Sequence, residues 1–136
     1  EFEANTAINC LDAPAPSVAA IEADAPAAAA AAPVFGVANL YSEMACPVWP
    51  VPATGRPGAI TAAGSPPIVV VGTTGDPATH YSEAQALAGK LQHGVLLTRE
   101  GEGHTAYPYS SCIRSAVDAY LISLTVPAAG IRCRSN

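Results

Sequence analysis

Two titratable side chains, Asp76 and His104, each follow a short apolar run by a few residues. The runs, residues 68–72 and 95–98, are rich in Val, Ile and Leu and are typical of strands buried in a parallel sheet. In such sheets, reactive groups gather at the carboxyl ends of the strands. An imidazole can take and return a proton, and a carboxylate beside it can fix its tautomer and stabilise its charged form. The spacing therefore predicts that Asp76 and His104 form a proton-transfer pair.

The order of these segments matches the order in α/β-hydrolase triads, where the chain carries Ser, then Asp or Glu, then His. Gly75, Gly101 and Gly103 favour the same interpretation, because residues without a Cβ allow tight loops to bring two side chains together. The alternative is a turn aspartate and a surface histidine without a chemical role. His80 and His93 are weaker candidates for the base, since we expect them at the two ends of the intervening helix.

Two helices are expected around these strands. Apolar residues at helical spacing predict a first helix that Thr79 caps and Gly94 ends. A second helix is predicted to begin at Ser110 or Ser111. Residues 65–136 therefore predict an α/β unit with parallel strands and a right-handed crossover.

The first half of the chain, residues 1–64, differs in composition from the rest. It is rich in proline and alanine, and it predicts short helices only around residues 17–23 and 34–43, joined by irregular chain. Its alanine-proline stretches resemble a linker more than a core. Since two strands cannot form a sheet that is buried on both faces, we expect the sheet of this chain to belong to a larger one.

Composition and charge exclude several kinds of partner. The 136 residues include six Lys and Arg against 11 Asp and Glu, for a formal net charge of −5, and they contain no basic run. This balance argues against nucleic acids and anionic membrane surfaces. No unbroken apolar segment of about 18 residues occurs, so no transmembrane helix is expected. The first residues also lack the pattern of a signal peptide.

Four cysteines, Cys10, Cys46, Cys112 and Cys133, lack CxxC spacing and a nearby histidine, which argues against a zinc site. Two disulfides have three possible connectivities. We favour Cys10–Cys46 and Cys112–Cys133, because each would tie an irregular stretch back to its neighbour and would stabilise the fold by roughly 3–4 kcal/mol. Disulfides imply an oxidising compartment. The alternative is four buried thiols in a cytosolic protein.

Two runs of the sequence carry a family resemblance. Residues 67–79 read Pro-Ile-Val-Val-Val-Gly-Thr-Thr-Gly-Asp-Pro-Ala-Thr, and residues 101–105 read Gly-Glu-Gly-His-Thr. With the region 112–133, they resemble the C-terminal region of the tripeptidyl aminopeptidase-like (TAP-like) branch of secreted bacterial α/β-hydrolase serine peptidases. Residues 7–12 and 46–50 look like the family's segments between the cap and the return to the sheet.

The resemblance implies a role for each of these residues. Asp76 matches the triad acid, His104 matches the triad base, and Cys112–Cys133 matches a disulfide that pins the final helix. The implied fold class is α/β, namely the C-terminal part of an α/β-hydrolase fold. Its last parallel strands and helices would fall in residues 65–136, after an irregular, cap-derived segment in residues 1–64. Relatives often carry proline at the position of His80.

The nucleophile expected of such a hydrolase is missing from this sequence. No Gly-x-Ser-x-Gly occurs: Gly64-Ser65 is followed by two prolines, and Ser110-Ser111 has no glycine neighbour. We therefore expect the chain to be inactive alone and to need, as its partner, the N-terminal portion of the same hydrolase. The resemblance implies an aminopeptidase or tripeptidyl peptidase that releases short N-terminal peptides, is secreted or held in the cell envelope, and needs no metal or organic cofactor.

Two other functions fit the same residues. A non-catalytic, disulfide-stabilised extracellular binding domain would not require the glycine-flanked Asp76 and His104 loops. An esterase would use the same dyad, because the triad serves both peptides and esters. Glu22 and Glu43 could bind a substrate amine, but the sequence does not distinguish them from ordinary surface carboxylates.

Overall fold

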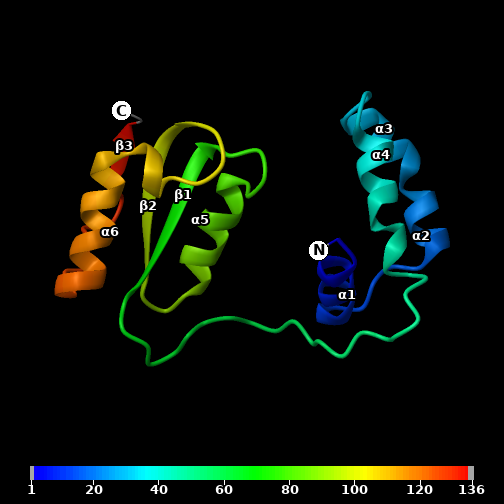
Figure 1. The fold of residues 1–136 in the computed structure, drawn as a ribbon, viewed down its shortest axis with the longest axis horizontal. Coiled ribbons are helices and arrows are strands. Elements are labelled where there is room, and N and C mark those ends of the chain that lie inside the picture. The colour runs from blue at the N-terminus through cyan, green and yellow to red at the C-terminus, as the bar shows by residue number, and fades with distance from the viewer. Residues whose placement is uncertain (1, 135–136) are drawn as a thin grey trace. The chain divides into compact units, whose positions relative to one another are not determined.

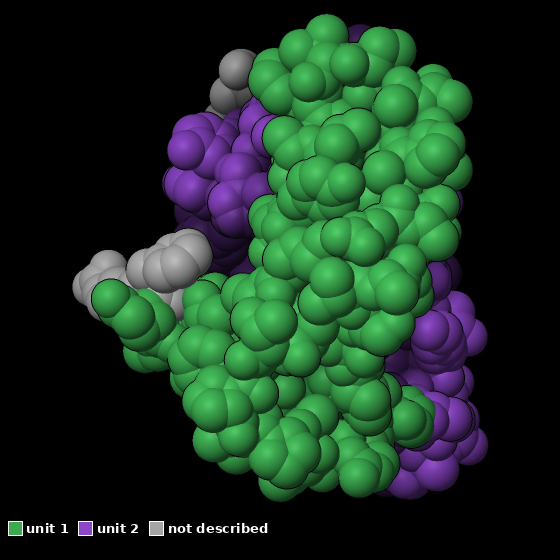
Figure 2. Space-filling view, turned by 90° about the vertical axis from the view of Figure 1, so that its right-hand side faces the viewer, with its two compact units in different colours: residues 1–58 green, residues 59–136 purple. Residues whose placement is uncertain are grey.

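The computed structural model describes residues 2–134 of the chain. The chain forms two compact units that meet in sequence between Gly58 and Ala59, and Figure 2 shows them in different colours. The first unit is helical, and the second contains all of the strands found in the described residues.

Short helices build the first unit. Ser17 caps the second of them, where its hydroxyl accepts a hydrogen bond from the Ala20 N–H at 3.2 Å. Ile21 of the same helix is 1% exposed and is the most buried hydrophobic side chain of this unit. The elements are α1 (Phe2–Asp12), α2 (Val18–Ala23), α3 (Ala25–Ala31), α4 (Gly36–Tyr41) and the 3-10 turn η1 (Ser42–Ala45).

The helices predicted around residues 17–23 and 34–43 are confirmed by α2 and by α4 with η1. The alanine-proline run, which was expected to resemble a linker more than a core, forms helix α3 and has no buried residue within it. Alanine has the highest helix propensity. Pro26 lies in the first turn, where its missing N–H removes no helical hydrogen bond. Helix α1 was also not predicted.

The second unit has a parallel sheet with strand order β1-β2-β3 (Figure 1). The parallel α/β arrangement predicted for this region is confirmed. Its third strand was not predicted, because β3 is three residues long and two of them are exposed arginines. The elements are β1 (Ile68–Gly75), α5 (Tyr81–Lys90), β2 (Gly94–Glu102), the 3-10 turn η2 (Tyr107–Tyr109), α6 (Ser111–Ser123) and β3 (Arg132–Arg134).

The helices α5 and α6 cover opposite faces of this sheet (Figure 1). Helix α5 approaches β1 at Gly72, where an added Cβ would lie 2.7 Å from the Ala84 Cβ. On the α6 side, a fully buried core joins β2, α6 and β3 through Leu97, Ile113 and Cys133. Burial of these side chains fixes which face of β2 and β3 is turned toward α6, and the parallel pairing places the carboxyl ends of the strands at the same edge of the sheet.

The ends of the two helices of this unit differ partly from the predicted ones. Helix α5 begins at Tyr81 with His80 as its N-cap, so Thr79 is not the cap. Ser110 caps α6, and its hydroxyl accepts from the Ile113 N–H at 3.4 Å. None of the helices within residues 2–134 is long and apolar enough to cross a membrane.

Candidate active site

The loops that follow β1 and β2 leave the sheet at the same edge. The strands are in regular register up to the pair Thr73 and Arg99, and the next pair is Gly75 with Glu102. Beyond it, the Gly103 N–H donates to the Gly75 carbonyl at 3.1 Å. Gly103 has a φ of +100°, a conformation that residues with a Cβ rarely adopt. The glycine-rich loop is thus held against the end of β1.

Asp76 and His104 meet at this edge. The His104 Nδ1 lies 3.0 Å from both Oδ1 and Oδ2 of Asp76. The Asp76 side chain is 3% exposed, whereas the His104 side chain is 54% exposed. The carboxylate is therefore sequestered beneath an imidazole that remains open to an incoming group.

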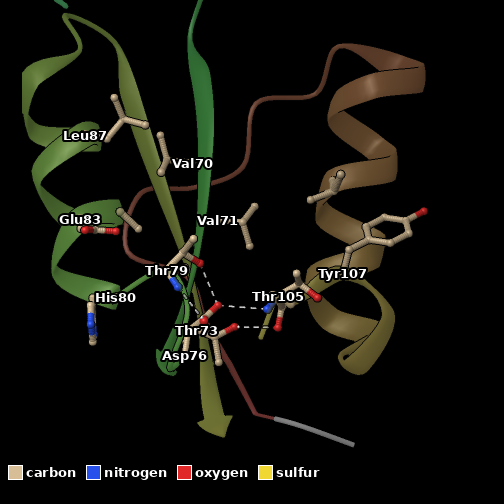
Figure 3. A pocket seen from close by; sticks show the side chains of 14 residues that line it. Val70, Val71, Thr73, Asp76, Thr79, His80, Glu83, Leu87, Thr105 and Tyr107 are labelled. Carbon is tan, nitrogen blue, oxygen red and sulfur yellow. Dashed lines mark hydrogen bonds between the residues drawn. The ribbon is translucent and has the colours of Figure 1, made fainter. Parts of the chain in front are cut away.

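The Asp76 carboxylate accepts several further hydrogen bonds (Figure 3). The N–H groups of Ala78 and Thr79 donate to Oδ1 at 2.9 Å. The Thr79 hydroxyl and the Thr105 N–H donate to Oδ2 at 3.0 Å. This is the role of Thr79 in place of the predicted helix cap.

These donors control the charge of Asp76. Hydrogen bonds from the backbone of Thr79, then of Thr105 and Ala78, and finally from His104 hold the pKa of Asp76 well below its ordinary value of 3.8. Burial acts in the opposite direction and raises this pKa, but the hydrogen bonds outweigh it. Asp76 is therefore an anion throughout the neutral range.

The charge of Asp76 determines which nitrogen of His104 carries the proton. An ionised carboxylate only accepts hydrogen bonds, so the Nδ1 that lies against it is the protonated nitrogen of the neutral ring. Nε2 then holds the lone pair, and no residue among 2–134 forms a hydrogen bond with it. The half-exposed ring thus presents a basic nitrogen away from Asp76, as a general base requires.

The residue after His104 adopts an unusual backbone conformation. Thr105 has a φ of +70°, which costs a non-glycine residue on the order of 1–3 kcal/mol. Its N–H donates to Asp76, and its carbonyl accepts from the Thr73 hydroxyl at 2.9 Å and from the Arg99 guanidinium at 3.1 Å. Sequence reasoning missed these contributions. The available signal was Arg99, a basic residue at the end of an apolar strand.

A cavity of about 440 Å³ adjoins Asp76 on the side of β1 (Figure 3). Asp76, Thr79 and His80 line one part of it, and apolar side chains such as Val70 and Leu87 line another. His104 does not line this cavity. A molecule bound there would meet the acid but not the base, so a reacting group must approach from the exposed side of His104.

The remaining histidines lie outside the dyad. His80 caps α5, and His93 lies between α5 and β2. Both are exposed, and neither ring forms a hydrogen bond with another of the described residues. His104 is therefore the histidine whose surroundings equip it for proton transfer.

The structure contains two disulfides. Cys10–Cys46 links α1 to the residue after η1, and Cys112–Cys133 links the first turn of α6 to β3. The second disulfide joins the core beneath the site, since Cys133 is 1% exposed and packs with Ile113. No cysteine in the described chain is free.

Relatives of this chain are known hydrolases. It is 48% identical over 89 residues to the serine protease Hip1 of Mycobacterium tuberculosis, which is 65% of this chain and 17% of the relative. It is 37% identical over 137 residues to carboxylesterase B of M. tuberculosis, which is 96% of this chain and 26% of the relative. A tripeptidyl aminopeptidase of Streptomyces lividans is 28% identical over 103 residues, 74% of this chain and 19% of the relative.

The chain thus spans between about a sixth and about a quarter of the length of these relatives. The sequence model of a family described as TAP-like protein matches residues 32–133, which include both Asp76 and His104. The matched region contains the parallel strands and the helices described above. The chain belongs to the TAP-like family, and its fold is that of the C-terminal part of an α/β-hydrolase.

Proposed function

We propose that this chain supplies the acid and the base of a serine hydrolase whose nucleophilic serine lies in another part of the same protein. The observation that carries the proposal is the hydrogen bond from His104 Nδ1 to a buried, ionised Asp76. The hydrolase names of the relatives and the absence of Gly-x-Ser-x-Gly from this sequence support it. The chain would be inactive alone.

The proposed mechanism assigns separate steps to the two side chains. His104 Nε2 takes the proton of the serine hydroxyl as the serine oxygen attacks the substrate carbonyl. Asp76 holds the ring and stabilises the imidazolium. His104 then returns the proton to the leaving amine or alcohol, and an acyl-enzyme remains. Water then attacks the acyl-enzyme in the same way: His104 takes a proton from the water and returns it to the serine oxygen as the carboxylic acid product leaves. His104 is neutral again at the end of each cycle, and Asp76 remains ionised throughout.

Peptides are the proposed substrates, with release of short N-terminal fragments. The resemblance to peptidases across residues 67–79 and 101–105 supports this choice, as do the serine protease and tripeptidyl aminopeptidase among the relatives. Small esters are the second candidate. Carboxylesterase B favours them, because its similarity covers 96% of this chain.

We also propose a secreted or cell-envelope location and an origin of residues 1–64 in the cap of the hydrolase. The two disulfides support the location, because they form and persist in oxidising compartments. Family membership supports the second assignment.

The test uses the full-length protein that contains this chain. It is treated with a serine-directed fluorophosphonate and assayed with a tripeptidyl anilide and with a small aryl ester. His104→Ala is expected to lower both labelling and turnover by at least about a thousandfold. His93→Ala is the matched control, because it removes an exposed imidazole from the same unit.

Each outcome has a defined meaning. Loss of activity in His104→Ala together with normal activity in His93→Ala supports the proposal. Full activity in His104→Ala, or labelling of a serine within this 136-residue chain when it is prepared alone, contradicts it. Absence of any hydrolysis by the full-length protein favours the binding domain instead. The ratio of anilide to ester turnover decides between peptidase and esterase.

A further inference from the structure

The peptide groups on both sides of Thr105 are held by buried side chains. On the N–H side, the Thr105 N–H donates a hydrogen bond to the Asp76 carboxylate, with an N···O distance of 3.0 Å. On the carbonyl side, the Thr73 hydroxyl and the Arg99 guanidinium donate to one oxygen at 2.9 and 3.1 Å. These bonds keep Thr105 at a φ of +70°, which a non-glycine residue rarely adopts without such support.

The sheet itself brings the two carbonyl donors together. Thr73 and Arg99 are register partners on β1 and β2, so their side chains emerge side by side on the same face. Thr73 is 2% exposed and Arg99 is 5% exposed. The backbone hydrogen bonds between β1 and β2 hold both residues in place, and burial shields their side chains from water.

Arg99 differs from most arginines, which lie at the protein surface. It is buried, its guanidinium carbon lies 5.1 Å from the centre of the Tyr109 ring, and no carboxylate within residues 2–134 forms an ion pair with it. A buried cation without an anion is costly unless polar groups compensate it. The Arg99 Nη1 donates to the Thr105 carbonyl, whereas the buried Nε has no hydrogen-bond partner among the described residues.

We propose that Thr73 and Arg99 are positioning residues for His104, which they hold in register with Asp76 through the Thr105 carbonyl. This inference rests on the proposed function, since it assumes that His104 is the base. His104 itself is half exposed and is held on one side by Asp76 alone. The conformation of the next residue therefore determines where its ring lies.

The first test replaces the Thr73 hydroxyl in the full-length protein. Thr73→Val keeps the shape of the side chain and removes the donor. We expect kcat to fall about tenfold or more with KM within about twofold, because small displacements of a catalytic group affect the reaction more than substrate binding. Thr73→Ser keeps the hydroxyl and should restore kcat to within about threefold of the wild-type value.

Thr98→Val is the matched control. Thr98 is 2% exposed and lies one residue before Arg99 on β2, and its hydroxyl is bonded to the Tyr81 hydroxyl at 2.7 Å and not to Thr105. The Thr98→Val substitution removes a buried hydroxyl of the same kind and leaves the hydrogen bonds of Thr73 and Arg99 to the Thr105 carbonyl in place. Thermal unfolding of both valine variants shows whether they are equally folded. An equal fall of kcat in Thr98→Val and Thr73→Val would overturn the proposal.

A double-mutant cycle tests whether the two donors act on one carbonyl. Arg99→Lys keeps the charge but loses the planar guanidinium, and it should also lower kcat. If both act through Thr105, the effect of the double variant is smaller than the product of the single effects. If the double variant shows the full product of the two single effects, the positioning role is contradicted. It is also contradicted if Thr73→Val keeps its kcat while His104→Ala is inactive, and the proposed function then still stands. Activity in His104→Ala contradicts the proposed function instead.

Discussion

The His104 imidazole and the Asp76 carboxylate lie 28 positions apart in the sequence, yet Nδ1 is 3.0 Å from both carboxylate oxygens. Two parallel strands produce this proximity, because their carboxyl ends share an edge of the sheet. The pair is asymmetric in exposure, with a buried acid and an open base. That asymmetry suits a base that must meet an external nucleophile.

Replacement of the acid should abolish turnover while leaving the fold intact. In the full-length protein, Asp76→Asn removes the negative charge and no longer fixes the proton on Nδ1 of His104. We expect kcat to fall by about 10⁴-fold, the size of the effect known for such an acid in serine proteases. The measurement is steady-state hydrolysis of the anilide and ester substrates.

Asp118→Asn provides the control for that variant. Asp118 accepts a hydrogen bond from the Tyr107 hydroxyl at 2.7 Å on α6, so the same chemical change is made at a carboxylate outside the dyad. Its turnover should stay within about twofold of the wild-type rate, since a substitution distant from the reacting groups removes no transition-state contact. A comparable loss in both variants would mean that charge or folding, and not the dyad, explains the result.

The stability of the protein should depend on pH through Asp76. The folded protein holds the pKa of this carboxyl below its ordinary value of 3.8. Its contribution to the free energy of unfolding is therefore complete well above pH 4 and declines as the pH falls below that value, because the unfolded chain then binds the proton more readily.

Urea unfolding at pH 7 and at pH 3 measures this effect. The midpoint of the wild-type protein should fall between the two pH values by more than that of Asp76→Asn, which lacks the titrating group. Equal changes in both proteins would show that Asp76 is not held ionised by its donors.

The close approach of α5 to β1 can be tested at Gly72. A Cβ there would lie 2.7 Å from the Ala84 Cβ and 2.9 Å from the Tyr81 Cδ2, so Gly72→Ala should destabilise the fold by about 1–3 kcal/mol. Gly89→Ala, within α5, meets no atom within 4 Å and should stabilise the helix by about 0.5–1 kcal/mol. Chemical unfolding of the two variants gives both values, and a stable Gly72→Ala would contradict the packing described here.

Removal of the Cys112–Cys133 disulfide should weaken the second unit. The link spans 21 residues, and loop entropy gives a loss of about 3 kcal/mol for Cys112→Ser with Cys133→Ser. Hydrogen exchange should quicken in β3 and α6. The Cys10→Ser with Cys46→Ser variant is the comparison, since it removes a disulfide from the first unit. Faster exchange confined to the first unit in both variants would contradict the expectation.

The sequence predicted the parts of the site that depend on local pattern. Asp76 and His104 could be paired because each follows an apolar run, and parallel strands bring such positions to one edge. Helix α3 was missed because its alanine-proline composition was interpreted as that of a linker, although a proline in the first turn of a helix is tolerated. Strand β3 was missed because three residues, two of them exposed arginines, show no periodicity.

The remaining parts of the site depend on contacts that no local pattern records. The left-handed conformation of Thr105 cannot be read from a threonine, since its residue type disfavours it. It arises from bonds to Asp76, Thr73 and Arg99, of which Asp76 and Thr73 lie about 30 positions away in the sequence. Thr79 was predicted as a helix cap for the same reason, since its partner Asp76 became apparent only in the folded chain.

The register of β1 and β2 limits the number of residues that can lie between Arg99 and His104. Between the pairs Thr73 with Arg99 and Gly75 with Glu102, β2 advances by three residues while β1 advances by two. Because side chains alternate between the faces of a sheet, this extra residue determines the face toward which the following loop turns. Deletion of a single residue here would reverse that alternation and carry His104 away from its acid. The loop between Arg99 and His104 therefore depends on its number of residues as well as on Gly103, whose positive φ favours glycine.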